Sequence, residues 1–253
     1  MPAIAAVFCC LVMVAATTTS AAASSCPCEG APAWNRPVLS DKAATARWMA
    51  RTLEWGVLST ISSRNNTTNM PFGNVYSFID GSCHNATGTP YFYGTYKDLS
   101  FQDIQSHPYA SLTLSEASLS TTCRSRTDPV VEASCTVQGG DPESPLCARL
   151  TMSGRMVEVS SSSFEDRDEF EFARQAFFTR HPQMATWPED HHWVVAKLVV
   201  TDIALIDYFG GATFLAPDEY FAVTPPAIVG ASREGAADDM NEISKTERVR
   251  RDN

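Results

Sequence analysis

The sequence predicts a mainly β fold with flanking helices, in the α+β class, from three features. Runs of β-branched and aromatic residues of strand length alternate with turn-rich clusters. Helix-favouring residues follow Ser40-Asp41. A second helical pattern occupies residues 164–180, with one apolar face and one charged face. We expect these elements to form one domain, residues 40–224.

The first half of this domain predicts two helices and four strands. The first helix begins at Ser40-Asp41. A short helix over residues 100–106 ends at His107-Pro108, because the residue before a proline is driven out of the helical region. The four strands have the aromatic and β-branched composition of pleated segments and are predicted at residues 55–62, 72–80, 91–96 and 109–115.

Residues 121–146 interrupt this order with glycines, prolines and little periodicity. The segment is too long for an ordinary connection, so we interpret it as an insertion held by a disulfide. We expect Cys123 to pair with Cys147, because these cysteines stand at the two ends of the insertion. Closing such a loop contributes about 3 kcal/mol in the chain-entropy description. Cys135 then pairs elsewhere or stays free.

The second half predicts a strand over residues 148–160, a helix over 164–180 and two more strands. Ser162 or Ser163 is expected to cap the helix, and His181-Pro182 ends it. The two strands are Trp193 to Val200 and Ile203 to Phe209, followed by a Gly210-Gly211 turn. Residues 225–253 are polar and aperiodic and predict a disordered tail.

The first 23 residues have the pattern of a signal peptide. An apolar run is followed by Ala21-Ala22-Ala23, the small residues that a cleavage site needs. The run is too short for a signal anchor, because spanning a bilayer takes about 20 apolar residues. No later segment is long and apolar enough to span a membrane. We therefore expect a secreted or extracellular chain, with residues 24–39 as an extended lead-in.

Charge and cysteine content agree with secretion. The formal net charge of -10 argues against direct nucleic-acid binding, which needs a basic surface. Six cysteines remain after removal of the signal, an even number that indicates disulfides. Asn65, Asn66 and Asn85 each begin an N-glycosylation tripeptide in a polar connection. Asn65 and Asn66 overlap, so we expect one glycan between them.

Few residues indicate chemistry. The sequence lacks the glycine motifs of hydrolase elbows, dinucleotide folds and phosphate loops, and adjacent histidines His191-His192 on a strand would point to opposite faces, which disfavours a metal site. Thr95 and Lys97 are two residues apart, so they share a face if their strand continues. A hydroxyl and an ammonium on one face can hold a phosphate; the alternative is a barrel rim with Lys97 in solvent.

Several segments resemble known families. Four of them, in the same order, resemble the flavin mononucleotide (FMN)-binding split barrel of the pyridoxamine phosphate oxidase-like superfamily: residues 54–62, 71–75, 91–100 and 107–112. Four others resemble the CREG family, the cellular repressors of genes stimulated by a viral oncoprotein: residues 141–147, 180–188, 197–198 and 207–211.

The resemblance implies a homodimer of split β-barrels with a cleft between the subunits. In flavin-binding relatives this cleft holds FMN, and Thr95, Lys97 and, more loosely, Ser111 match part of the phosphate site. The basic residue that usually follows the second strand's proline is absent, since Phe72-Gly73-Asn74 follows Pro71. In the CREG family an added loop fills the cleft, and the insertion 121–146 is the corresponding candidate.

These observations lead to an expected function and two rivals. We expect a non-enzymatic, secreted or endolysosomal glycoprotein that binds no cofactor and acts through protein or receptor binding. The resemblance implies an indirect influence on cell growth and differentiation. The first rival is an FMN-dependent oxidoreductase that grips the phosphate with Thr95, Lys97 and Ser111. The second is an intracellular regulator whose signal is not used.

Overall fold

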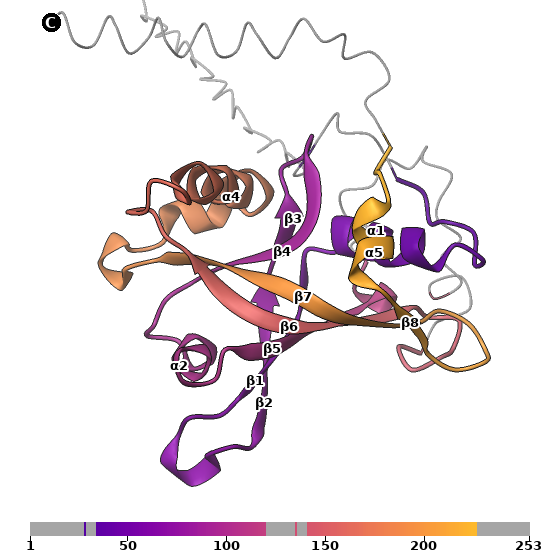
Figure 1. The fold of residues 1–253 in the computed structure, drawn as a ribbon, viewed down its shortest axis with the longest axis horizontal. Coiled ribbons are helices and arrows are strands. Elements are labelled where there is room, and N and C mark those ends of the chain that lie inside the picture. The colour runs from indigo at the N-terminus through magenta and orange to yellow at the C-terminus, as the bar shows by residue number, and fades with distance from the viewer. Residues whose placement is uncertain (1–27, 29–33, 120–134, 136–140, 227–253) are drawn as a thin grey trace, which may run out of the picture.

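The structure is a computed structural model that describes residues 28, 34–119, 135 and 141–226. The predicted signal peptide, most of the lead-in and insertion, and nearly all of the predicted tail lie outside the described residues. Figure 1 shows a strongly twisted antiparallel sheet with helices packed around it. This arrangement confirms the predicted mainly β fold with flanking helices.

Within the described residues the sheet has eight strands in the order β2-β1-β5-β6-β7-β4-β3, with β8 paired to β7. All pairings are antiparallel. The strands are β1 (Trp55–Ile61), β2 (Pro71–Ser77), β3 (Ile79–Gly81), β4 (Ala86–Gly94), β5 (Tyr109–Ser115), β6 (Arg149–Val159), β7 (Val194–Ile206) and β8 (Thr213–Leu215).

In the described part of the chain, four α-helices flank the sheet: α1 (Lys42–Thr52), α2 (Leu99–Ser106), α4 (Arg167–Arg180) and α5 (Pro217–Ala222). Short 3-10 turns occur at η1 (Asn65–Thr67), η2 (Glu116–Ser118), η3 (Pro182–Thr186) and η4 (Glu189–His191). The predicted start of the first helix is confirmed, because Asp41 Oδ1 accepts a hydrogen bond from Ala44 N at 2.9 Å.

Two apolar clusters hold the helices to the sheet. The larger lies where α1 and α5 meet the sheet and includes fully buried Trp48, Leu58 and Leu112. The smaller packs Phe177 of α4 against Val195 of β7 and neighbouring residues. Buried and partly exposed positions alternate along β1 and β5, as the two-residue period of a strand requires.

The two predicted strands after Trp193 form one continuous strand, β7, which ends at Ile206. Thr201-Asp202 is not a break. The register with β6 shifts between Ser153 and Gly154, so β7 carries an extra residue there as a β-bulge. Gly154 permits this close approach, because an added Cβ would lie 2.0 Å from the Val199 carbonyl oxygen. Tyr208 and Phe209 consequently lie beyond the strand.

The start of α4 also differs from the prediction. The helix begins at Arg167 with Asp166 at the N-cap, and the Asp166 side chain makes no capping hydrogen bond. The predicted cap from Ser162 or Ser163 is therefore wrong, because residues 161–166 form bends and turns ahead of the helix. The end at Arg180 is confirmed, since His181 leaves the helical region ahead of Pro182.

Two disulfides join cysteines that the structure describes. Cys28 pairs with Cys83 and ties the lead-in to the β3–β4 turn. Cys147 pairs with Cys135, and their Cα atoms lie 4.3 Å apart. The predicted partner of Cys147 is thus corrected from Cys123, which lies outside the described residues, to Cys135. Loop entropy could not decide between them, because doubling a loop changes the closure free energy by only about 0.6 kcal/mol.

A buried ionic cluster joins α1, β3 and α4. The Asp80 carboxylate is fully buried, and guanidinium nitrogens of Arg180, Arg51 and Arg47 lie 2.9, 3.3 and 3.7 Å from its oxygens. Arg51 and Arg180 also donate to backbone carbonyls of Ser82 and Arg51. One carboxylate therefore organises three arginines from two helices.

Candidate functional site

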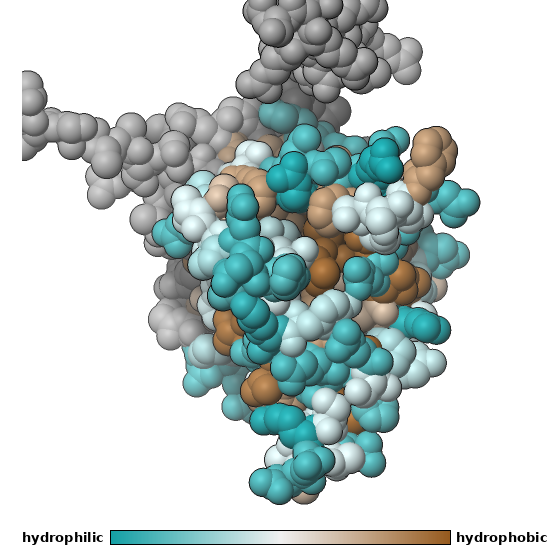
Figure 2. All heavy atoms as spheres, turned by 90° about the vertical axis from the view of Figure 1, so that its left-hand side faces the viewer, coloured by the Kyte–Doolittle hydropathy of each residue, from teal (hydrophilic) through white to brown (hydrophobic). Residues whose placement is uncertain are grey.

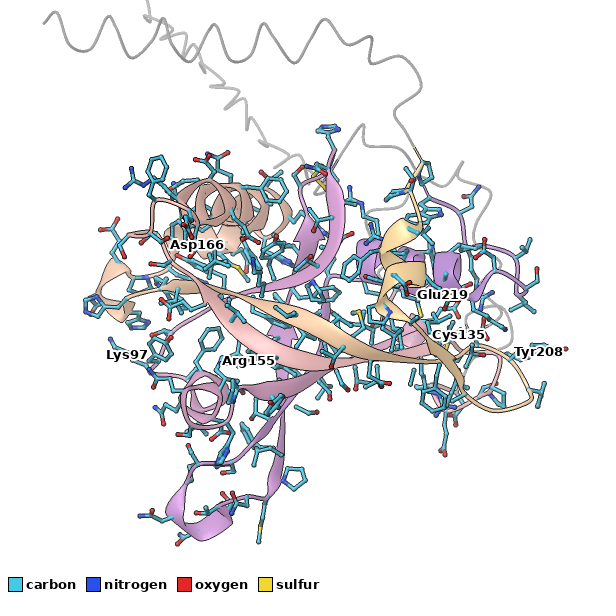
Figure 3. The ribbon with its side chains drawn as sticks, viewed as in Figure 1. Lys97, Cys135, Arg155, Asp166, Tyr208 and Glu219 are labelled. Atoms are coloured by element: carbon cyan, nitrogen blue, oxygen red, sulfur yellow. A yellow bond between two sulfur atoms is a disulfide. The ribbon has the colours of Figure 1, made fainter. Side chains whose placement is uncertain are left out.

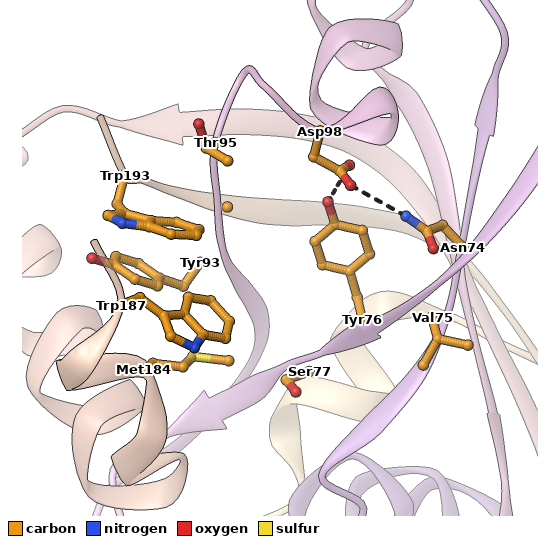
Figure 4. Close-up of a pocket in the computed structure, with 11 residues that line it drawn as sticks. Asn74, Val75, Tyr76, Ser77, Tyr93, Thr95, Asp98, Met184, Trp187 and Trp193 are labelled. Atoms are coloured by element: carbon orange, nitrogen blue, oxygen red, sulfur yellow. Dashed lines mark hydrogen bonds between the residues drawn. The ribbon is translucent and has the colours of Figure 1, made fainter. Parts of the chain in front are cut away.

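A pocket of about 370 Å³ opens at the end of the sheet where β2 and β4 meet η3 and the start of β7. Figure 4 shows a group of aromatic rings on one side of it and polar side chains on the other. Its lining consists of Asn74, Val75, Tyr76, Ser77, Tyr93, Gly94, Thr95, Asp98, Met184, Trp187 and Trp193.

The aromatic wall consists of Tyr93 from β4 together with Trp187 and Trp193. The Tyr93 and Trp193 rings stack with centroids 5.2 Å apart, and Trp187 lies 4.8 Å from Trp193. Trp193 Nε1 donates to the Pro188 carbonyl oxygen at 2.8 Å, which closes the turn between the two tryptophans. The turn thereby holds two rings against β4.

The polar wall centres on Asp98, which caps α2 by accepting a hydrogen bond from Ser100 N at 2.8 Å. The Tyr76 hydroxyl donates to Asp98, and Asn74 Nδ2 lies 3.4 Å from Asp98 Oδ2 (Figure 4). Burial and the Asp98 acceptor raise the pKa of Tyr76 far above its ordinary value. Tyr76 therefore remains a neutral hydrogen-bond donor in the pocket.

Thr95 and Lys97 do not share a strand face, because β4 ends at Gly94 and both residues lie in the connection after it, where both bind backbone carbonyls of the η4 turn. Thr95 Oγ1 donates to the His191 carbonyl oxygen at 2.5 Å. Lys97 Nζ donates to the Asp190 carbonyl oxygen at 3.2 Å. Thr95 lines the pocket whereas Lys97 does not, and Lys97 lies at the surface in Figure 3.

Ser111 does not join these residues. It lies on β5, and its hydroxyl exchanges a hydrogen bond of 2.8 Å with Ser153 Oγ on β6. It is absent from the pocket lining. The structure therefore brings together two of the three residues matched to a phosphate site and leaves the third on a neighbouring part of the sheet.

Sequence reasoning missed Trp187, Trp193 and Asp98 as pocket residues. Trp193 resembles the first residue of a strand, and Trp187-Pro188 resembles a helix stop. A usable signal is the pair of tryptophans separated by a polar turn of five residues directly before a strand. Asp98 resembles an ordinary helix cap, which it also is.

The histidine pair offers no metal site. His191 closes η4 and His192 follows it with a left-handed backbone, so both precede β7. Across residues 28, 34–119, 135 and 141–226, no group of three or more metal-ligating side chains occurs. His191 instead packs near Trp193, with ring centroids 5.5 Å apart.

The three predicted glycosylation positions are exposed. Asn65 and Asn66 lie in η1, between β1 and β2, and Asn85 lies in the β3–β4 turn. Figure 1 shows these two connections at opposite ends of the molecule. None of the described helices is long and apolar enough to cross a membrane.

One face of the sheet carries apolar side chains that are exposed to solvent. The registers place Val75, Val57, Tyr109 and Val199 on the same face of β2, β1, β5 and β7. Val75 is 63 % exposed and Tyr109 is 67 % exposed. Val75 also lines the pocket, so this exposed sheet face continues into it. Figure 2 shows apolar side chains in a hollow among hydrophilic ones at the pocket end of the molecule.

Comparisons with known proteins place this geometry in context. Residues 37–222 match the family model described as "CREG, beta-barrel". Human protein CREG1 is 37 % identical over 188 residues, covering 74 % of this chain and 77 % of the relative. Mouse protein CREG2 is 40 % identical over 183 residues, covering 72 % of this chain and 57 % of the relative.

A solved structure shares the fold at low sequence identity. A heme-binding protein from Mycobacterium smegmatis superimposes with a TM-score of 0.50 and 17 % identity, over 75 % of this chain and 62 % of that chain.

Proposed function

Because this chain belongs to the CREG beta-barrel family, we propose that it is a non-enzymatic, secreted or endolysosomal glycoprotein. It uses the split barrel as a scaffold for binding a cell-surface or sorting receptor and influences growth and differentiation indirectly. The observation that carries the non-enzymatic part is the engagement of Thr95 and Lys97 by the η4 carbonyls.

The pocket offers few favourable contacts to the phosphate group of a flavin. A phosphate dianion is held best by charge-assisted hydrogen bonds from Lys or Arg. Among the residues that line the pocket, none is Lys or Arg, and Asp98 contributes a negative charge. The Thr95 hydroxyl is already donated to His191, and the Phe72-Gly73-Asn74 segment of β2 lacks a basic residue.

The rival function is an FMN-dependent oxidoreductase. The observation that favours it is the proximity of Thr95 and Lys97 at the pocket end of β4, since Lys97 N donates to Thr95 Oγ1 at 3.2 Å. If η4 moved away, both side chains would be released. Ser111 would then have to act from a different part of the sheet.

Protein secreted from a eukaryotic culture is expected to show no flavin absorption in the visible range. Its intact mass is expected to exceed that of the chain from residue 24 onward by two N-glycans, one at Asn65 or Asn66 and one at Asn85. One absorption spectrum and one mass spectrum, before and after enzymatic deglycosylation, report both features.

Lys97→Ala separates the two functions. If the protein is a scaffold, the variant loses only an exposed contact to the Asp190 carbonyl oxygen. Its thermal stability and its response to titration with FMN should then equal those of the wild-type protein. Stoichiometric flavin in the wild-type protein, lost in Lys97→Ala without loss of fold, would establish the oxidoreductase instead. Unglycosylated protein that retains residue 1 would contradict secretion.

We further propose that the exposed sheet face binds a second copy of the chain. Apolar side chains at Val75, Tyr109 and Val199 lie there near small hydroxyl residues such as Ser111, and exposed Arg155 lies in register between Tyr109 and Val199. Tyr109→Glu is expected to convert a dimer into a monomer, measured as molar mass by light scattering after gel filtration. Phe164→Glu is the control, because Phe164 is 90 % exposed outside this face; a monomeric wild-type protein would refute the dimer.

A further inference from the structure

We propose that the pocket binds a small aromatic amine in its protonated form, with the ring against the tryptophan wall and the ammonium near Asp98. The proposal concerns a ligand of this chain and does not depend on the scaffold function. Its basis is the combination of pocket size, aromatic lining and charge.

The size and walls of the pocket suit a ligand of one or two rings. A volume of about 370 Å³ lies within the range of about 300–1,000 Å³ found for small-molecule sites. Tyr93, Trp187 and Trp193 form one wall, and Figure 4 places them across the pocket from Tyr76, Asp98 and Asn74. A flat aromatic ring bound between these walls would displace water and pack one face against the aromatic wall.

The charge of the pocket determines which sign of charge a ligand should carry. Asp98 is the one Asp, Glu, Lys or Arg among the lining residues, so the pocket has a net negative charge. Its Oδ1 accepts hydrogen bonds from Ser100 N and the Tyr76 hydroxyl. From the residues that the structure describes, its Oδ2 accepts only the long 3.4 Å contact from Asn74 Nδ2. A carboxylate oxygen has further acceptor capacity, and an ammonium group supplies the strong, charge-assisted donor that Oδ2 lacks.

The neighbouring cation does not compete for Asp98. The Lys97 ammonium donates to the Asp190 carbonyl oxygen and lies outside the pocket lining. The Thr95 hydroxyl is likewise donated to His191. Because Lys97 and Thr95 donate to the η4 carbonyl oxygens, they offer no donors to a bound anion and do not neutralise Asp98. The Asp98 carboxylate is therefore available to a cationic ligand.

The test uses three indole ligands of similar size and different charge. Calorimetric titration of the full-length protein at pH 7 is expected to give the order tryptamine, then neutral tryptophol, then anionic indole-3-acetate. We expect tryptamine to bind roughly tenfold more tightly than indole-3-acetate, as expected for one half-buried charge contact. Equal affinities for the cation and the anion, or no tryptamine binding at millimolar concentration, would overturn the proposal.

Two variants localise the effect. Asp98→Asn keeps a helix-capping side chain and an acceptor for Tyr76 but removes the charge, so the preference for tryptamine over tryptophol is expected to disappear. Asp190→Asn is the control, because that carboxylate is 78 % exposed and its carbonyl contact to Lys97 is unchanged. Trp187→Leu is expected to weaken all three ligands alike. A preference for tryptamine that survives Asp98→Asn in a folded protein would also refute the site.

Discussion

Replacing Asp80 by asparagine is expected to lower the free energy of unfolding by about 3–5 kcal/mol, the cost of removing one partner of a buried ion pair. Asp80 is fully buried beside Arg47, Arg51 and Arg180, and Arg47 and Arg180 are themselves almost fully buried. Asparagine preserves the size of the side chain and removes the carboxylate that lies closest to these arginines, while Glu54 acts on Arg180 only as a weaker electrostatic contribution.

The pKa of the Arg180 guanidinium shows the opposing effects within the cluster. Burial lowers this pKa, and the Asp80 carboxylate raises it again. Arg47 Nε and Nη1 already lack hydrogen-bond partners among the described residues, so no spare acceptor replaces Asp80. The loss therefore leaves three cations in a weakly polar interior.

Urea denaturation of the purified protein measures the effect. Asp190→Asn is the matched control, because the Asp190 side chain is 78 % exposed, and it should change stability by less than about 0.5 kcal/mol. The double variant Asp80→Asn/Arg180→Met should lose less stability than the sum of the losses measured for the two single variants, because both residues belong to one cluster. Additive losses, or a loss below about 1 kcal/mol for Asp80→Asn, would refute the role assigned to the cluster.

Acidification from pH 7 to pH 4 is expected to destabilise the fold by about 3 kcal/mol through His181 alone. Burial lowers the pKa of His181 to about 4, the carbonyl oxygen of Phe78 counters this effect, and nearby Arg180 adds to it. His181 Nε2 lies 3.3 Å from that carbonyl oxygen. The folded protein therefore holds a neutral imidazole in place after α4.

The sign of the effect follows from proton binding. The unfolded histidine has a pKa near 6.5, so between pH 6.5 and 4 the unfolded state binds more protons than the folded state. The stability contributed by neutral His181 is fully present above pH 6.5 and decreases as the pH falls toward 4. An endolysosomal protein would experience most of this range.

Denaturation at several pH values between 4 and 7.5 measures this dependence. His181→Gln keeps a hydrogen-bond donor for Phe78 and removes the titration, so the slope of stability with pH should flatten. His84→Gln is the control, because His84 is exposed in the β3–β4 turn. A slope identical in wild-type and His181→Gln proteins would show that His181 does not titrate as its burial requires.

Several elements could be predicted from local sequence. Asp41 starts α1 through its own side chain, and His181-Pro182 ends α4, because both signals act within a few residues. The alternation in β5 likewise depends only on which residues face the core. By contrast, Thr201 resembles a strand break until its pairing with β6 is known, since a bulge depends on the partner strand.

The candidate site divides in the same way. Thr95 and Lys97 were identified from their spacing, but their partners, the carbonyls of His191 and Asp190, lie more than 90 residues away. Asp98 and Trp193 form opposite walls of one pocket from different elements. The composition of a pocket depends on which distant segments meet. The spacing of residues along the chain does not contain this information.

Local residues were enough to predict the mainly β class, the start of α1, the ends of α2 and α4, the positions of the glycosylation tripeptides and the family. Each of these depends on contiguous residues. The partner of Cys147, the continuity of β7, the three arginines around Asp80 and the sign of charge in the pocket became clear only from the three-dimensional arrangement. These depend on distances between groups far apart in the chain, because hydrogen bonds and ion pairs weaken steeply as their atoms separate.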